Sequence, residues 1–307
     1  MTPVFEAIET YLYAVASLAE TTFVSYRDKL KVFQEFCESK GIYLEEITPK
    51  VFRSFLDSIS ERINPQTGVP VSGFTISSYG RVVKVFLTWV STYEDYLGVI
   101  RPGTLKAMRV PALEKKLKPT FTVEEVYALY EACKREGTRF LIDRDRAIIT
   151  LLLDTGIRAS ELCSLKLEDV HLSPEDPYIK VHGKGNKWRE VGLGHQASVD
   201  LNRYIKRYRR GAAPDSLVFL NRMREPLTRN GLDQVLYRLK AWAGIKKSGG
   251  VHMFRHTFAT QYIDHGGDVY NLRDLMGHEH VSTTEIYVRG TNQKRARKAR
   301  GSVWDNL

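Results

Sequence analysis

Five side chains in the second half of the chain have the chemistry needed to attack a phosphodiester. Tyr287 lies nine residues after His278, and upstream of both lie the pair His252 and Arg255 and, further back, Arg158. A phenol can act as the nucleophile, and fixed guanidinium groups can stabilise the charge that develops on a five-coordinate phosphorus. Each residue type is common, so the prediction rests on their order and their local sequence contexts.

Two nearby patterns suggest other chemistry, and we reject both. The segment Gly-His-Glu-His at 277–280 lacks the i,i+4 histidines of a zinc-protease helix and has no third ligand nearby, so no metal site is expected. The segment Gly-Lys-Gly-Asn-Lys at 183–187 lacks the upstream glycine and the trailing Ser or Thr of a nucleotide-binding P-loop. We therefore expect the protein to use no cofactor.

Hydrophobic periodicity and helix breakers predict the elements that hold the arginines. An apolar helix is expected over 144–154, and Gly156 ends it just before Arg158. A second helix is expected over 252–265. Because His252 and Arg255 are three residues apart on it, both side chains leave the same face.

Two local patterns position the other candidates. Alternating residues at 178–181 and 188–193 around a glycine-containing turn predict a β-hairpin, with Lys184 at its turn. Ser282 and Glu285 have the spacing of a capping box, which places Tyr287 in the first turns of a short helix.

The rest of the chain is expected to be mainly helical and to form two domains. The first hundred residues predict four helices, over 5–18, 21–39, 48–59 and 72–96, and later helices are expected over 196–210, 228–242 and 269–276. Residues 110–119 are extended, basic and bounded by prolines, and Thr122 to Glu125 has capping-box spacing. We predict a helical domain over 1–112, a basic linker to about 118, and a mostly helical domain with a small β-hairpin or sheet over 119–307.

The distribution of charge indicates a polyanionic partner for the second domain. The formal net charge is +10, yet residues 1–112 carry 12 Lys or Arg against 12 Asp or Glu, leaving 34 against 24 for residues 113–307. Basic residues cluster at 203–210 and 294–300. Clustered cations favour phosphate contacts through counterion release, so nucleic acid is the expected partner.

Other features exclude a membrane or secreted protein. No apolar run approaches the roughly 18 residues that cross a bilayer, and the N-terminus has no signal-peptide pattern. The cysteines, Cys37, Cys133 and Cys163, are odd in number and far apart, as reduced thiols are. We expect a cytoplasmic, nucleoid-associated protein.

Four segments resemble the successive motifs of the tyrosine recombinases, and the Xer-like integrases are the most similar branch. They are Asp-Thr-Gly-Ile-Arg-Ala-Ser-Glu-Leu at 154–162, the hairpin turn at 183–187, His-Met-Phe-Arg-His-Thr-Phe-Ala-Thr at 252–260, and the stretch at 275–287. The resemblance covers essentially the whole second domain, and the first domain is similar to the family's core-binding domain in size and helix pattern. It implies a two-domain clamp on DNA that recombines specific sites through a Holliday junction, without metal or ATP.

The resemblance implies a role for each candidate residue. Tyr287 would attack the scissile phosphate to form a 3′-phosphotyrosyl link, while Arg158 and Arg255 hold the non-bridging oxygens. Lys184, or Lys187 if the turn has a different register, would protonate the leaving 5′-oxygen. The remaining positions match supporting roles: His252 in deprotonating the tyrosine or bonding the phosphate, His278 as a further donor to the phosphate, and Glu161 in orienting the cations. His256 and His280 are expected to serve packing or DNA contacts.

DNA contacts and assembly are predicted less directly. The candidate DNA-binding residues are Arg81 and Lys84 on the fourth helix, Lys115 and Lys116 in the linker, and Thr228, Arg229 and Gln234 at the start of a helix. The implied partner is double-stranded DNA with an inverted-repeat site, bound by a homo-tetramer. Trp304 is a candidate anchor for docking the C-terminal tail on a neighbouring protomer. The alternative is a disordered basic tail.

Two other functions remain open at this level. A type IB topoisomerase or a telomere-resolving enzyme shares the same chemistry, and a non-catalytic DNA-binding regulator can share the same fold. The DNA target and the biological role are not encoded in these motifs.

Overall fold

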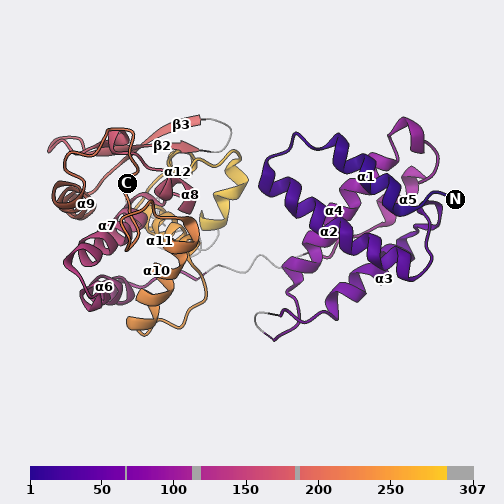
Figure 1. Ribbon diagram of the computed structural model, residues 1–307, viewed down its shortest axis with the longest axis horizontal. Coiled ribbons are helices and arrows are strands. Elements are labelled where there is room, and N and C mark those ends of the chain that lie inside the picture. The colour runs from indigo at the N-terminus through magenta and orange to yellow at the C-terminus, as the bar shows by residue number, and fades with distance from the viewer. Residues whose placement is uncertain (66–67, 113–118, 184–186, 289–307) are drawn as a thin grey trace, which may run out of the picture. The chain divides into compact units, whose positions relative to one another are not determined.

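The computed structural model describes residues 1–65, 68–112, 119–183 and 187–288 (Figure 1). The chain divides into two compact units, Met1–Lys115 and Lys116–Leu307, and each has its own hydrophobic core. Within the described residues, no helix has the length and apolarity needed to cross a membrane.

The first unit is helical. Its α-helices are α1 (Val4–Ala14), α2 (Glu20–Ser39), α3 (Pro49–Ser60), α4 (Gly73–Val90) and α5 (Pro102–Ala107), with short 3₁₀ turns at Leu44–Glu46 and Glu94–Tyr96. Aromatic side chains fill the core between α2, α3 and α4, where the Phe33 and Phe55 ring centroids lie 4.9 Å apart and Phe86 is fully buried. The Thr48 and Ser72 hydroxyls cap α3 and α4 by accepting backbone N–H bonds.

Three details of this unit differ from the prediction. Helix α1 ends at Ala14, four residues before the predicted end. Helix α4 ends at Val90, and a 3₁₀ turn replaces the last part of the expected helix. Helix α5 begins at Pro102 and was not predicted. Proline is tolerated at the first helical position because its missing N–H would have no helical partner there.

The second unit combines α-helices with one small sheet among its described residues. The helices are α6 (Val123–Ala132), α7 (Arg139–Thr155), α8 (Ala159–Cys163), α9 (His195–Tyr208), α10 (Arg229–Trp242), α11 (Val251–Asp264) and α12 (Val269–Met276). Short 3₁₀ turns lie at Cys133–Arg135, Leu167–Asp169 and Val281–Thr283. The sheet is antiparallel in the order β1 (Val170–His171), β2 (Tyr178–Gly183) and β3 (Lys187–Gly192). Strands β2 and β3 are the predicted hairpin, while β1 was not expected.

Helix α7 is the central element of this unit. It packs against α9 and α11, and its Ile148, Leu151 and Leu152 side chains are fully buried. The helix begins five residues before the predicted start because it also buries charged residues. Asp143, for example, accepts bonds from Arg207 and Tyr208 at 2.9 and 3.0 Å. Paired charges can be buried, so the hydrophobic pattern alone missed this first turn.

The turn after α7 fixes the position of Arg158. Gly156 ends α7 in the left-handed conformation (φ +60°), and a Cβ atom added there would lie 2.4 Å from Cδ1 of Phe258. Only glycine fits both the backbone and the space. Arg158 follows as the N-cap residue of α8.

Candidate active site

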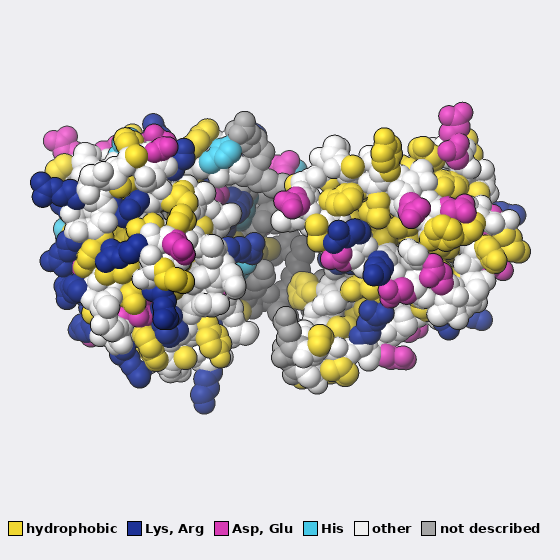
Figure 2. All heavy atoms as spheres, in the orientation of Figure 1, with side chains coloured by type: hydrophobic (Ala, Val, Ile, Leu, Met, Phe, Trp, Pro, Cys, Tyr) yellow, Lys and Arg dark blue, Asp and Glu magenta, His cyan; other side chains and the backbone are white. Residues whose placement is uncertain are grey.

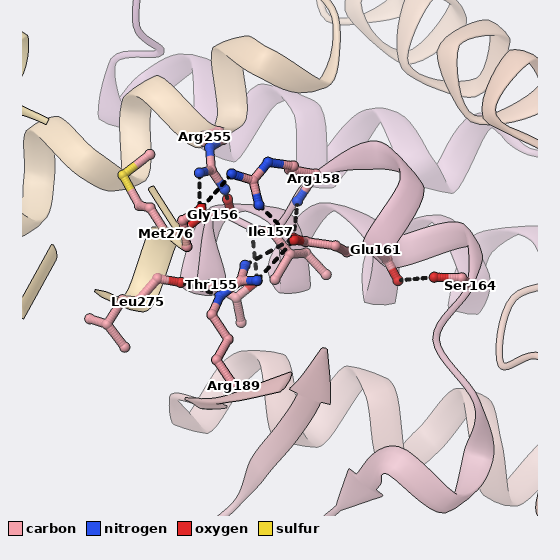
Figure 3. A network of polar contacts seen from close by, with 11 residues as sticks. Thr155, Gly156, Ile157, Arg158, Glu161, Ser164, Arg189, Arg255, Leu275 and Met276 are labelled. Atoms are coloured by element: carbon pink, nitrogen blue, oxygen red, sulfur yellow. Dashed lines mark hydrogen bonds and ion pairs between the residues drawn. The ribbon is translucent and has the colours of Figure 1, made fainter. Parts of the chain in front are cut away.

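The buried carboxylate of Glu161 joins two arginines (Figure 3). Its Oε1 accepts from the guanidiniums of Arg158 and Arg189 at 2.8 and 2.9 Å, and its Oε2 accepts from Arg189 at 2.9 Å and from the backbone N–H of Arg158 at 2.7 Å. The side chain is 2% exposed. Burial alone would raise the pKa of Glu161, but these hydrogen bonds and the two positive charges lower it to about 2. Glu161 is therefore ionised at neutral pH.

The C-terminal end of α12 holds three guanidiniums through consecutive backbone carbonyls. Arg189 donates to the carbonyl oxygen of Leu275 at 2.8 Å, Arg255 to that of Met276, and Arg158 to that of Gly277 at 2.7 Å. Carbonyls at a helix C-terminus carry partial negative charge, which favours cations. These bonds gather arginines from α8, β3 and α11 at one place.

Arg255 is the most buried of the three arginines. It is 5% exposed and also donates to the carbonyl oxygen of Gly156 at 2.6 Å. Burial and the neighbouring charge of Arg158 lower the pKa of Arg255 to about 10, so it keeps its charge at neutral pH. The turn that ends α7 therefore also orients this guanidinium.

Tyr287 lies in the first turn of a helix, as predicted, but this helix begins at residue 285, and the predicted N-cap residue Ser282 lies within the 3₁₀ turn Val281–Thr283. The residue is 8% exposed, and its hydroxyl oxygen is hydrogen-bonded to Nδ1 of His256 at 2.6 Å. Burial raises the pKa of Tyr287 to about 12, although the positive charge of Arg255 acts in the opposite direction. The phenol is therefore protonated at rest and lies within electrostatic reach of Arg255.

His278 follows the end of α12 and is neutral. Its Nδ1 is hydrogen-bonded to the hydroxyl of Thr284 at 2.9 Å. Burial and the charges of Arg255, Arg158 and Arg189 lower its pKa to about 4. A neutral imidazole beside three guanidiniums adds no further positive charge.

The remaining catalytic candidates lie at the edge of this centre or outside the described residues. His252 is exposed on α11, one turn before His256. Lys184 lies outside the described residues, and Lys187 is exposed at the start of β3. A Cβ atom added at Gly183 would lie 3.2 Å from a terminal nitrogen of Arg189. The strand that leads to Lys184 therefore ends beside the arginine cluster.

The predicted DNA-binding residues have varied surroundings. Arg81 is exposed on α4, whereas the ammonium of Lys84 donates to the carbonyl oxygen of Met108 at 2.8 Å and so ties α4 to the segment after α5. Thr228 caps α10 by accepting from the Gly231 N–H at 3.1 Å. The other positions are Arg229 and Gln234, which are exposed, and Lys115, Lys116 and Trp304, which lie outside the described residues.

Two residues of the centre were not predicted. Arg189 lies opposite the buried Val181 in the β2–β3 register, and directly paired residues share a face of the sheet. An arginine at an inward-facing strand position is a signal that the sequence contained. For His256 the expectation was packing or a DNA contact, but the residue is hydrogen-bonded to Tyr287.

Basic side chains are common on the second unit, and ordinary ion pairs hold part of them. Many Lys and Arg side chains lie on the face of this unit that Figure 2 shows. Within the basic cluster on α9, Arg203 and Arg207 bind the carboxylates of Asp200 and Asp143, both at 2.9 Å. Among the described residues, no group of three His, Cys, Asp or Glu side chains is arranged as metal ligands would be.

Comparisons with known proteins identify the family to which this chain belongs. Residues 119–294 match the phage integrase family, and residues 7–67 match the N-terminal SAM-like domain of phage integrases. Tyrosine recombinase XerC of Staphylococcus epidermidis is 30% identical over 295 residues, which cover 93% of each chain. Tyrosine recombinase XerD of Chlorobaculum tepidum is 29% identical over 289 residues, which cover 92% of this chain and 90% of the relative.

Solved structures show the same fold. The XerH site-specific recombinase in a pre-cleavage complex with its difH substrate aligns with a TM-score of 0.73 at 24% identity, covering 97% of this chain and 84% of XerH. A lambda integrase tetramer bound to a Holliday junction aligns with a TM-score of 0.68 at 18% identity, covering 91% of this chain and 78% of the integrase. The family match over most of the second unit and the 30% identity over nearly the whole chain confirm the resemblance seen in the motifs. The chain belongs to the phage integrase family and is a site-specific tyrosine recombinase.

Proposed function

We propose that this recombinase cleaves DNA by attack of the Tyr287 hydroxyl oxygen on the scissile phosphorus. The Oη–P bond forms as the bond to the 5′-oxygen breaks, giving a 3′-phosphotyrosyl link and a free 5′-hydroxyl. The observation that supports this most directly is the buried phenol next to Arg255, in a centre where three arginines are held by one carboxylate and three carbonyls. Because the ester is conserved in the link, rejoining needs no external energy source.

Arg158 and Arg255 hold the non-bridging oxygens of the phosphate in this proposal. Guanidinium groups stay charged and bind phosphate in a bidentate way, so they stabilise the additional negative charge of the transition state. Arg158 is 28% exposed at its side chain, which leaves it accessible to DNA. His278, kept neutral, donates a further hydrogen bond, and the exposed His252 contacts the phosphate. Glu161 and Arg189 orient the arginines without reacting.

Lys184 protonates the leaving 5′-oxygen in the same proposal. It directly follows Gly183, whose neighbours include Arg189, and an ammonium is a suitable general acid. Lys187 is the alternative donor. Replacing each lysine by alanine and comparing the cleavage of ordinary DNA with that of DNA carrying a sulfur at the leaving position identifies the acid. Only the loss of the true acid is relieved by the better leaving group.

The nucleophile is tested with a nicked suicide substrate that traps the covalent protein–DNA adduct. Tyr287→Phe removes the hydroxyl and should abolish the adduct. Tyr270→Phe, on the exposed surface of α12, is the matched control and should leave adduct formation unchanged. An adduct formed by Tyr287→Phe would contradict the assignment, and relaxation of supercoils without recombination would instead indicate a topoisomerase.

The two units bind double-stranded DNA at an inverted-repeat site, with residues 1–112 as the core-binding domain and 119–307 as the catalytic domain. The protein therefore acts at the nucleoid, in the cytoplasm, in this proposal. Of the predicted DNA-binding cations among the described residues, Arg81 and Arg229 are exposed. Alanine at either position should weaken binding in gel-shift assays and reduce its salt dependence, as the loss of a phosphate contact does. Loss of binding to one target sequence alone would indicate a base contact.

A homo-tetramer assembles on the DNA through the C-terminal tail, with Trp304 of one protomer bound to the next. An apolar cavity of about 500 Å³ on the second unit supports this assignment and is lined by Phe121, Val126, Tyr127, Leu153 and Phe258. Buried aromatic anchors are common in such interfaces. Trp304→Ala and Tyr127→Glu should both prevent tetramers from forming on DNA in analytical ultracentrifugation. Tyr237→Glu, which changes another well-exposed tyrosine outside the cavity, is the control.

A further inference from the structure

The proton on the Tyr287 hydroxyl must leave when its oxygen attacks phosphorus. Burial makes this phenol a weaker acid than an ordinary tyrosine, so at neutral pH almost every molecule carries the proton. A nucleophile of this kind needs an adjacent proton acceptor. The resemblance to tyrosine recombinases assigns that work, or a bond to the phosphate, to His252.

The structure places a different imidazole at the phenol. His256 Nδ1 is 2.6 Å from the Tyr287 hydroxyl oxygen, within the range in which a proton can pass directly. His256 is 9% exposed and lies four residues after the exposed His252, on the same face of α11. The Nδ1 atom of His278, a half-buried imidazole of the same centre, is hydrogen-bonded to Thr284.

A second functional side chain, Arg255, lies near the phenol that His256 contacts. Arg255 directly precedes His256 on α11, and its positive charge acts to lower the pKa of Tyr287. The phenol therefore lies near both Arg255 and His256. His256 thus contacts the Tyr287 phenol, while Arg255, the proposed phosphate-binding cation, acts on the same phenol through its charge. A tyrosine oxygen in this position can lose its proton to His256 as it attacks a phosphate held by Arg255.

We propose that His256 is a catalytic residue that accepts the Tyr287 proton during DNA cleavage and returns it during rejoining. This inference rests on the proposed function. In cleavage the Tyr287 O–H bond breaks and its proton moves to His256 Nδ1. At the same time the tyrosine oxygen forms its bond to phosphorus, the bond between phosphorus and the 5′-oxygen breaks, and the leaving 5′-oxygen takes a proton from Lys184. In rejoining each proton moves back. His252, at the exposed start of α11, is left to contact the phosphate.

The proposal requires a particular tautomer of His256. To accept from the phenol, neutral His256 must carry its proton on Nε2 and leave Nδ1 free of one. Nitrogen-15 NMR of histidine-labelled wild-type protein reads this directly. A His256 that is protonated on Nδ1 in the free protein would overturn the proposal without any substitution.

The variant His256→Asn separates proton acceptance from hydrogen bonding. The Asn side-chain oxygen can take the place of Nδ1 and accept the phenol hydrogen bond, but it is not basic at neutral pH. We expect its rate of adduct formation on the suicide substrate to fall about 100-fold, the lower end of the usual range for general acid–base catalysis. DNA binding should be retained. His265→Asn, at the exposed end of α11, is the matched control and should cleave at the wild-type rate.

Fluorinated tyrosine at position 287 distinguishes proton transfer from positioning. A more acidic phenol needs less help in losing its proton, so the 100-fold difference between His256→Asn and wild type should shrink to about 10-fold or less. A difference that stays the same would mean that His256 only positions the ring, and His256→Asn cleavage within about threefold of wild type would exclude a proton-transfer role.

The control variants keep this outcome separate from the proposed function. If Tyr287→Phe still forms the adduct, the nucleophile is wrong and the proposal falls with it. If Tyr287→Phe is inactive while His256→Asn is active, the nucleophile stands and only the proton acceptor is wrong. A sulfur at the leaving position should restore Lys184→Ala but not His256→Asn, because the sulfur relieves only the proton donor.

Discussion

Neutralising Glu161 tests how strongly one carboxylate holds the arginine cluster together. Glu161→Gln keeps the shape of the side chain and can still accept a hydrogen bond, but it removes the charge that Arg158 and Arg189 share. The ordinary pKa of 4.5 is lowered to about 2 in the folded protein. Since a tenfold change in an equilibrium is worth about 1.4 kcal/mol, this difference corresponds to about 3 kcal/mol of stability at pH 7.

The pH dependence follows from the direction of that change. A carboxylate whose pKa is lower in the folded state stabilises the fold fully above pH 4.5 and loses its contribution as the pH falls toward 2. At pH 3 the same pKa values leave about 1.4 kcal/mol. The difference in stability between wild type and Glu161→Gln should therefore shrink by about half between pH 7 and pH 3.

Urea unfolding of the full chain, followed by circular dichroism and tryptophan fluorescence, measures both values. Glu190→Gln is the matched control, because its carboxylate is 63% exposed and lies 3.7 Å from the Lys180 ammonium. An exposed pair of this kind is worth at most about 1 kcal/mol. If Glu161→Gln costs less than about 1 kcal/mol at pH 7, or the same amount at both pH values, the arginines are held by the carbonyls of α12 and the reasoning about Glu161 is wrong.

Three further outcomes follow from single contacts in the centre. Gly156→Ala should lower the unfolding free energy by about 2 kcal/mol or more, because the added Cβ atom would clash with the Phe258 ring at a residue in the left-handed conformation. Gly137→Ala is the control: a Cβ atom there has no neighbour within 4 Å, so the same urea experiment should show almost no change in stability. Arg189→Lys keeps a positive charge, but a lysine cannot contact both Glu161 oxygens and the Leu275 carbonyl at once. Adduct formation on the suicide substrate should therefore fall about tenfold or more, while DNA binding remains. NMR titration should show His278 taking up its proton near pH 4, with no change between pH 5.5 and 8; a midpoint near the ordinary value of 6.5 would mean that the three guanidiniums are not close to it.

Much of the centre could be predicted because its residues lie at helix ends and turns, which leave strong local signals. Gly156 marks the end of α7, so the place of Arg158 at the next helix start follows from the sequence. The alternation around the 183–187 turn likewise located the hairpin. Periodicity works here because each element buries one face against the core.

The residues that were missed depend on contacts between distant segments. His256 and His252 share a face of α11, and only the position of the Tyr287 helix determines which imidazole contacts the phenol. Arg189 has no local motif, since its partners come from α8 and from the end of α12. Hydrophobic periodicity also placed the start of α7 too late, because the charges of its first turns are neutralised by Arg207 and other residues far along the chain.

The charge of the centre suits the transition state better than the substrate. Arg158, Arg189 and Arg255 bring three positive charges and Glu161 one negative charge, while His278 stays neutral, so the centre carries about +2. A phosphodiester carries one negative charge, and the five-coordinate species formed by tyrosine attack carries two if the phenol proton has left and the 5′-oxygen has not yet received one. In the proposed mechanism these fixed positive charges therefore attract the transition state more strongly than the substrate, which is the condition for accelerating the chemical step rather than merely binding DNA. The second negative charge develops only when the proton leaves the tyrosine oxygen. His256, 2.6 Å from the phenol oxygen, can accept that proton, while the neutral His278 adds no charge of its own.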